Sequence, residues 1–154
     1  METNPRFPLR ERPPESYKEA PRSFGSRRDG GKRQHAGCDL YTKPFADVLA
    51  VADGTVLMYY HFYDGVYALE VKYPFGIVRY GEVCLPTVKA GQQVKRGEVI
   101  ARVGKMIHIQ QSMLHFELYA GTAIGPLTDR ARPPFMRRAD LQDPTEFLDR
   151  CVVE

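Results

Sequence analysis

The sequence predicts an all-β protein with an antiparallel sandwich or barrel-like core. Six short segments between residues 46 and 120 are rich in the β-branched and aromatic residues that strands favour. Turn signals such as Asp53-Gly54 and Asp64-Gly65 separate these segments. Short strands joined by frequent turns are typical of antiparallel sheets, and only one segment has the character of a helix.

Residues 1–23 are predicted to form an extended, basic, proline-rich arm. The first 34 residues hold nine Lys or Arg against five Asp or Glu, and five of the 12 prolines. Because such a segment has little to bury, we expect a tether or a strap across a groove. A basic arm can also bind nucleic acid or an anionic polymer, but the absence of interleaved aromatic residues and of a nucleic-acid motif makes nucleic acid an improbable partner.

The β domain is predicted over residues 24–120. Strands are expected, in chain order, at 48–52, 55–63, 66–73, 77–83, 98–103 and 113–119. Further turns are expected at Pro74-Phe75-Gly76, Ala90-Gly91 and Arg96-Gly97, because each supplies a residue that tolerates positive φ.

Residues 121–154 form a C-terminal extension. The part before residue 143, which contains Arg130-Ala131-Arg132-Pro133-Pro134, is expected to lie on the surface and frame one end of a groove. One short helix is expected over 144–151, with Asp143 as its N-cap and Pro144 at its first position.

Length and composition narrow the class of protein. A chain of 154 residues suits one domain with a real core, and its mean hydropathy of −0.41 does not fit a membrane protein. The first residues contain no apolar run of the kind found in signal peptides. The three cysteines have no CxxC spacing, which argues against a disulfide framework. We expect Cys38 to be a buried small residue. The sequence leaves the oligomeric state open.

Three residues form a candidate metal site. His35 and Asp39 are four residues apart, and His115 follows in a segment of alternating apolar residues that would fix it on one face of a strand. Two imidazoles and one carboxylate are ligand types that a catalytic zinc ion favours when a fourth position stays open. Gly37 would let the chain turn so that His35 and Asp39 converge. His61 lacks such partners and is interpreted as an ordinary strand residue.

The residues around these three resemble the lysostaphin-type zinc metallopeptidases. Phe24-Gly25-Ser26-Arg27 and His35-Ala36-Gly37-Cys38-Asp39 match the opening of that domain, and Met113-Leu114-His115-Phe116-Glu117 matches its His-x-His-Phe-Glu signature. Between them, residues 48–56 and 88–101 match its Val-x-Ala-x-x-Asp-Gly-x-Val stretch and its glycine-punctuated hairpin. The resemblance covers about residues 24 to 120 in the family's order.

The resemblance implies the duplicated hybrid motif fold and a zinc ion held by His35, Asp39 and His115. It also implies hydrolysis of peptide bonds in bacterial peptidoglycan. That substrate lies outside the cytoplasm, in the periplasm or beyond the cell. With no signal peptide visible, the chain would need a phage particle, a secretion device, lysis or a missing upstream segment to reach it.

Two positions depart from the family pattern. The family carries two further histidines that assist the chemistry without binding the metal, and this chain has Glu82 and Met113 in their places. A carboxylate can act as general base, so Glu82 is the candidate catalytic residue, whereas the Met113 thioether makes no strong hydrogen bond. The alternative is a module that keeps zinc and binds the wall or a partner without catalysis. His108, in the loop before His115, is interpreted as a solvated loop residue and is not assigned to the site.

Residues 88–104 also resemble the hairpin of lipoyl and biotinyl carrier domains. Those domains need an attachment lysine in an Asp-Lys-Ala or Met-Lys-Met setting, and the sequence contains neither triplet. A carrier function would also leave His35, Asp39 and His115 unexplained, so we disfavour it.

Overall fold

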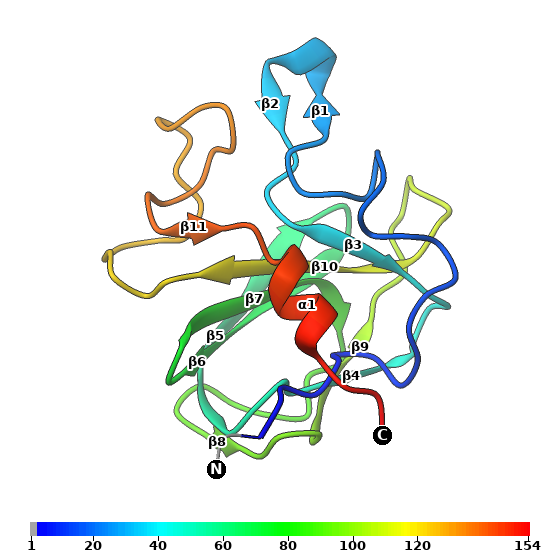
Figure 1. Ribbon diagram of the computed structural model, residues 1–154, viewed down its shortest axis with the longest axis vertical. Coiled ribbons are helices and arrows are strands. Elements are labelled where there is room, and N and C mark those ends of the chain that lie inside the picture. Colours follow the sequence, from blue (N-terminus) through cyan, green and yellow to red (C-terminus); the bar gives the residue numbers. More distant parts are fainter. Residues whose placement is uncertain (1–2) are drawn as a thin grey trace.

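Nine strands join into one antiparallel sheet, in which β11, β10, β7, β6, β5 and β8 follow one another (Figure 1). β3 pairs with β10, and β9 connects β4 to β7. The computed structural model describes residues 3–154. Its elements are β1 (Arg27–Arg28), η1 (Asp29–Gly31), β2 (Arg33–Gln34), β3 (Cys38–Tyr41), β4 (Asp47–Leu49), β5 (Gly54–Tyr63), β6 (Val66–Tyr73), β7 (Gly76–Cys84), β8 (Gln93–Val94), β9 (Val99–Val103), β10 (Met113–Tyr119), β11 (Leu141–Gln142) and α1 (Thr145–Arg150).

The six predicted strands correspond to β4, β5, β6, β7, β9 and β10, so the all-β antiparallel class is confirmed. The turn between β5 and β6 shows why the sequence signal worked. Asp64 and Gly65 have φ values of 48° and 80°, the left-handed conformation that a two-residue hairpin loop requires. β3, β8, β11 and the small β1–β2 hairpin were not predicted, because each has at most four residues and no long alternating pattern.

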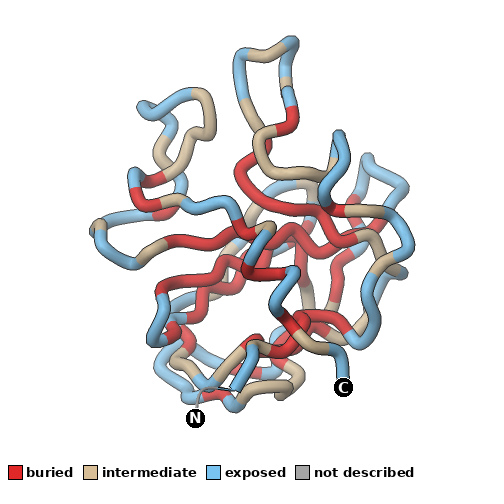
Figure 2. The backbone as a smooth tube through the Cα atoms, viewed as in Figure 1, coloured by how far each residue is buried: buried red, intermediate tan, exposed pale blue. Residues whose placement is uncertain are grey.

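The core lies on one side of this curved sheet. Tyr80, Leu114 and Phe116 on β7 and β10 are fully buried within it, and buried backbone follows these central strands (Figure 2). The Tyr80 hydroxyl is satisfied there, since it lies 2.6 Å from the Tyr73 hydroxyl and accepts the Val51 N–H at 3.2 Å. Alternate residues of the same strands therefore face the opposite side of the sheet, where the functional residues gather.

The N-terminal segment differs from the prediction that it has little to bury. Phe7 and Leu9 are buried in the core, 0% and 3% exposed, together with Tyr17. The Phe7 N–H donates to the Val152 carbonyl at 2.8 Å, and the Val152 N–H donates to the Pro5 carbonyl at 2.9 Å. The prediction followed the charge and proline content of the segment and overlooked Phe7 and Leu9. Because these two apolar residues are at alternate positions, they face the same side of an extended chain. This part of the segment belongs to the folded core.

The C-terminal helix begins at Thr145, one residue later than predicted, and ends at Arg150. Pro144, rather than the predicted Asp143, is the N-cap, and the Asp143 carboxylate accepts the Thr145 N–H at 2.9 Å from one residue further out. Phe147 and Leu148 are buried, and the Phe147 ring packs 5.9 Å from that of Phe116. Within residues 3–154, no helix has the length and apolar character needed to cross a membrane.

Two projections stand at one end of the sheet. One is the β1–β2 hairpin, and the other is the loop of residues 120–140 between β10 and β11, drawn in yellow to orange (Figure 1). They touch: the Gln34 N–H donates to the Pro134 carbonyl at 2.9 Å, and the Phe24 and Phe135 rings stack at 4.9 Å. The face of β7 and β10 that carries the functional residues lies at their base.

Candidate metal and catalytic site

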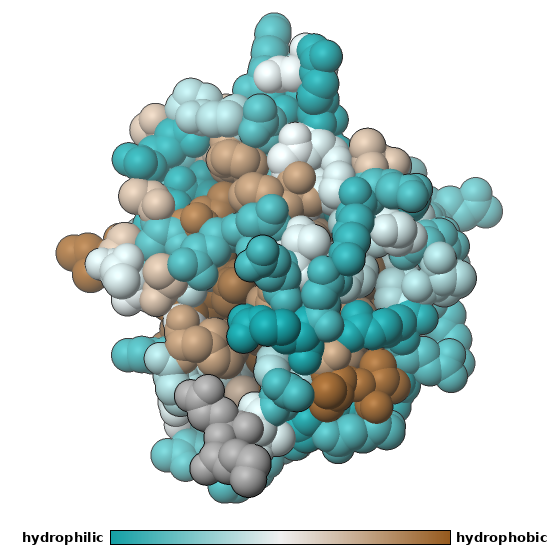
Figure 3. Space-filling view, in the orientation of Figure 1, coloured by the Kyte–Doolittle hydropathy of each residue, from teal (hydrophilic) through white to brown (hydrophobic). Residues whose placement is uncertain are grey.

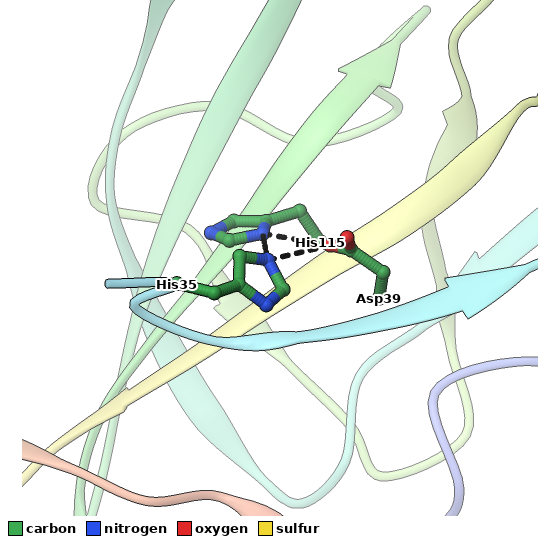
Figure 4. A group of neighbouring side chains, drawn as sticks. All are labelled: His35, Asp39 and His115. Atoms are coloured by element: carbon green, nitrogen blue, oxygen red, sulfur yellow. Dashed lines mark hydrogen bonds and ion pairs between the residues drawn. The ribbon is translucent and has the colours of Figure 1, made fainter. Parts of the chain in front are cut away.

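His35, Asp39 and His115 lie together in the structure. Asp39 on β3 is directly opposite His115 on β10 in the strand register, and His35 comes from the turn that precedes β3. Asp39 Oδ1 lies 3.0 Å from both His35 Nε2 and His115 Nδ1, and the two nitrogens are 3.2 Å apart (Figure 4). All three side chains are buried. Three potential ligand atoms from two distant segments of the sequence thus converge on one position.

Gly37 permits this convergence through a close backbone approach. A Cβ atom at Gly37 would lie 2.4 Å from the Phe116 carbonyl oxygen, which is too close for any other residue. We expected this glycine to serve a turn, but Gly37 is not among the residues with positive φ. Its function is to let the segment between His35 and Asp39 press against β10.

The second nitrogen of each histidine has a partner that sets the tautomer. His35 Nδ1 donates to the Ser23 carbonyl at 3.0 Å, and His115 Nε2 donates to Glu117 Oε2 at 2.6 Å. Neutral imidazoles held in this way direct the lone pairs of His35 Nε2 and His115 Nδ1 at each other. Two facing lone pairs repel unless a cation or proton lies between them. The donor set therefore fits a zinc ion, with a partner on the outer nitrogen of each imidazole ligand.

The electrostatics also favour positive charge at this point. Burial would raise the pKa of Asp39, but hydrogen bonds with His115 and His35 outweigh it and hold that pKa at about 2. Burial would lower the pKa of His115, yet its hydrogen bonds with Asp39 and Glu117 raise it to about 10. The carboxylates on both sides of the His115 ring thus favour positive charge at this point, carried either by a proton or by a divalent cation.

Glu117 is the buried anion behind His115. It is fully buried, and it accepts hydrogen bonds from Arg79 Nε at 3.0 Å and from Arg137 Nε at 3.1 Å. Burial would raise the pKa of Glu117, but these two arginines hold it well below its usual range. This network was not predicted from the sequence. The available signal was Arg79, a charged residue that alternates with the core residues Val78 and Tyr80 of β7.

Glu82 reaches the same site because β7 bulges. Gly81 pairs with Ala68 and Val83 pairs with Tyr67, which leaves Glu82 as an extra residue, with φ of 63°. Regular alternation would place Glu82 on the core side next to Tyr80, and the bulge turns it toward His115 instead. Glu82 Oε2 lies 3.9 Å from His115 Nδ1, and the buried Oε1 has no hydrogen-bond partner in residues 3–154. Burial raises the pKa of Glu82 to about 8.

The other residues that we considered lie in different places. Met113 lines the site, 8% exposed, and packs with Val66 and Met106. His108 is 83% exposed and pairs with Asp64 through Nδ1 at 2.6 Å, as expected of a loop residue. His61 is a residue of β5 at the rim of the groove. Cys38 is buried on the core side, as predicted, with its sulfur 3.7 Å from Thr145 Oγ1.

A groove of about 910 Å³ opens above these residues. Its floor contains the three candidate ligands and Glu82, and aromatic side chains from β3, β5 and the 120–140 loop form much of its wall. The aromatic residues of the wall are Tyr41, Tyr60, Phe62, Tyr63 and Phe135. The volume is large enough for several residues of an extended chain, which would pass over the candidate ligands.

Comparison with known proteins identifies relatives of this chain. The model of peptidase family M23 matches residues 33–126, more than half of the chain. A search of the curated proteins found no match.

Three solved structures are informative. LytU superimposes with a TM-score of 0.69 at 23% identity, over 90% of this chain and 92% of its own. The catalytic domain of lysostaphin, an antimicrobial peptidase from Staphylococcus simulans, gives 0.64 at 21%, over 82% and 89%. A zinc-containing peptidase from Vibrio cholerae gives 0.56 at 29% identity, over 74% of this chain but 37% of its own. The lysostaphin-type fold is thereby confirmed.

Proposed function

Because the chain belongs to peptidase family M23, we propose that it is a zinc-dependent endopeptidase that hydrolyses peptide bonds of bacterial peptidoglycan. The observation that carries the proposal is the convergence of His35 Nε2, Asp39 Oδ1 and His115 Nδ1 beneath an open groove. Such a substrate lies outside the cytoplasmic membrane, so the protein would act in the periplasm or beyond the cell.

In this proposal His35, Asp39 and His115 hold zinc. A bound zinc ion supplies Lewis acidity, which polarises a peptide carbonyl and makes water acidic enough to ionise near neutral pH. Glu82 is the general base: its buried Oε1 has no hydrogen-bond partner in residues 3–154 and would accept the proton of the attacking water. The protonated Glu82 carboxyl would then return that proton to the leaving amine.

Met113 limits the expected rate. It lines the groove where the family has a histidine, and its thioether cannot donate a hydrogen bond to an oxyanion. Losing one such donor typically lowers turnover by a factor of about 10² to 10³. We therefore propose an enzyme that is slower than a family member with both histidines.

The test is digestion of purified cell-wall sacculi by the zinc-loaded protein and its Glu82→Gln variant. The wild type should release soluble fragments, and Glu82→Gln should do so about 10² to 10⁴ times more slowly. Zinc content, measured by mass spectrometry, should remain one ion per chain in both, because Glu82 is not a proposed ligand. His108→Gln is the matched control, since His108 lies outside the groove, and it should digest as wild type does. Intact sacculi after treatment with the zinc-loaded wild type would refute the proposed activity.

A second candidate function is a zinc-retaining module that binds the cell wall or a partner without catalysis. The observation that favours it is Met113, which leaves the groove without the family's second helper histidine. The double variant Met113→His, Glu82→His discriminates the two functions. If only the double variant digests sacculi, the natural chain is a binding module; if the wild type already digests them, the enzyme proposal stands.

A further inference from the structure

Four arginines line one end of the groove, which has no lysine in its wall. Arg28 and Arg33 belong to the β1–β2 hairpin, and Arg130 and Arg137 belong to the 120–140 loop. Because the hairpin and the loop touch through Gln34–Pro134 and the stacked Phe24 and Phe135, these charges share one end of the groove. The exposed surface of the projecting hairpin is hydrophilic (Figure 3). We call the four residues the arginine end.

The pairing of the hairpin places like charges side by side. Arg28 and Arg33 are direct partners across β1 and β2, and like charges in this arrangement destabilise a strand pair. Nearby acceptors neutralise the positive charge of each arginine only in part. Arg33 Nε lies 2.6 Å from Asp29 Oδ2, and Arg28 Nη2 donates to the Pro21 carbonyl at 2.7 Å while lying 3.8 Å from Asp39 Oδ2. A bound anion would relieve the remaining repulsion.

The 120–140 loop adds to the arginine end one residue without an ion pair in the described chain, Arg130, and one, Arg137, that is paired with Glu117 through only part of its guanidinium group. Arg130 is exposed and makes no hydrogen bond or ion pair with residues 3–154. Arg137 uses Nε for Glu117 and Nη1 for the Met136 carbonyl, which leaves Nη2 without a partner in the same residues. The acidic residues in the groove wall, Asp39 and Glu82, are buried at its floor. Asp39 is a proposed metal ligand, so the arginine end keeps an excess of positive charge.

We propose that the arginine end binds a carboxylate of the substrate, with Arg33 and Arg130 as the residues that determine specificity. Guanidinium groups present planar pairs of donors that match a carboxylate, and neighbouring Phe135 offers an apolar surface for the adjoining chain. The inference rests on the proposed function and deepens it. The preferred substrate is a peptide with free carboxylates beside the cleaved bond, and an uncharged peptide fits this end poorly.

The proposal is tested by equilibrium binding of dye-labelled tetrapeptides to the full zinc-loaded chain, followed by fluorescence anisotropy at low salt. The probes are Ala-Glu-Lys-Ala amide, Ala-Gln-Lys-Ala amide and Ala-Gln-Lys-Ala with a free C-terminal carboxylate. We expect the Kd of the glutamate peptide to be about tenfold below that of its glutamine counterpart. The third probe carries a terminal carboxylate in place of the glutamate side chain. If the arginine end prefers side-chain carboxylates, the third probe will bind less tightly than the glutamate peptide. Equal Kd values for all three probes would overturn the proposal.

Single substitutions test whether the arginine end causes the preference for the glutamate peptide over the glutamine peptide. Arg33→Gln and Arg130→Gln should each remove most of the tenfold difference while binding the neutral probe as wild type does. Arg132→Gln is the matched control, because Arg132 is exposed in the same loop but does not line the groove. If the preference survives in both variants, the carboxylate binds zinc directly and the inference fails. It also fails if Arg132→Gln loses as much as Arg130→Gln.

These measurements are independent of hydrolysis. Carboxylate preference in a protein that leaves sacculi intact would sustain the binding site and refute the enzyme. Digestion of sacculi without carboxylate preference would sustain the enzyme and refute the arginine end.

Discussion

At the scale of single residues, Glu82 combines three unfavourable features. Its φ of 63° is left-handed, its side chain is buried, and one carboxylate oxygen has no hydrogen-bond partner in the described chain. Each of these destabilises a folded protein, and such residues cluster at functional sites. The strain at Glu82 is therefore the strongest indication, apart from the ligands, that this face of the sheet has been shaped for chemistry.

Glycine and alanine at position 82 should separate the backbone strain from the side-chain effects. Both substitutions remove the carboxylate, but only glycine adopts φ of 63° without a steric penalty. We expect Glu82→Gly to have a free energy of unfolding about 1 kcal/mol above that of Glu82→Ala, measured by denaturant titration with a metal chelator present. An alanine variant as stable as the glycine variant would mean that the backbone is not left-handed here.

At the scale of the elements, the site depends on β3 lying against β10. The sequence predicted β10 and its histidine, because Met113 to Tyr119 has the composition of a buried strand. It did not predict β3, whose four residues include the charged Asp39 and show no alternating pattern. The bulge that presents Glu82 was also not predicted, because one inserted residue produces no distinctive pattern in the sequence of β7. Sequence thus identified the candidate residues, while the contacts that orient them required the fold.

Gly37→Ala should disrupt this strand pair. The added Cβ would lie 2.4 Å from the backbone oxygen of Phe116, and backbone cannot move aside as a flexible side chain can. We expect a loss of more than about 3 kcal/mol in the free energy of unfolding and a weaker zinc affinity, measured by denaturant titration and by calorimetry. Gly91→Ala is the control: its Cβ meets open space at φ of 86°, so it should cost about 1 kcal/mol and leave zinc affinity unchanged. Equal effects of the two variants would contradict the close approach.

At the scale of the whole molecule, the N-terminal segment completes the core. Its charge and prolines suggested a loose arm, yet Phe7 and Leu9 are buried beside the C-terminal helix residue Leu148 in a single hydrophobic cluster. The two ends of the chain thereby hold each other, through the parallel bridge between Arg6 and Val152. Composition alone could not reveal this, since two apolar residues among many polar ones are a weak signal until their burial is known.

Phe7→Ala should therefore destabilise the entire domain. Removal of a fully buried phenylalanine typically costs about 3 to 5 kcal/mol, because it loses apolar burial and leaves a cavity. Phe45→Ala is the matched control, since that ring is 52% exposed and its loss should cost less than about 1 kcal/mol. Both values can be measured by denaturant titration. A small effect at Phe7 would restore the interpretation of the segment as a tether.

The position of the chain ends has a practical consequence. Arg6 and Val152, close to the two ends of the described chain, pair in a parallel bridge. The described parts of both ends lie at the opposite end of the molecule from the projecting β1–β2 hairpin (Figure 1). The groove lies at the other end of the molecule. A label, a tag or a second folded unit joined near these ends would therefore leave the groove open. Fusion to carriers or targeting modules is therefore an engineering route that this architecture tolerates from both directions.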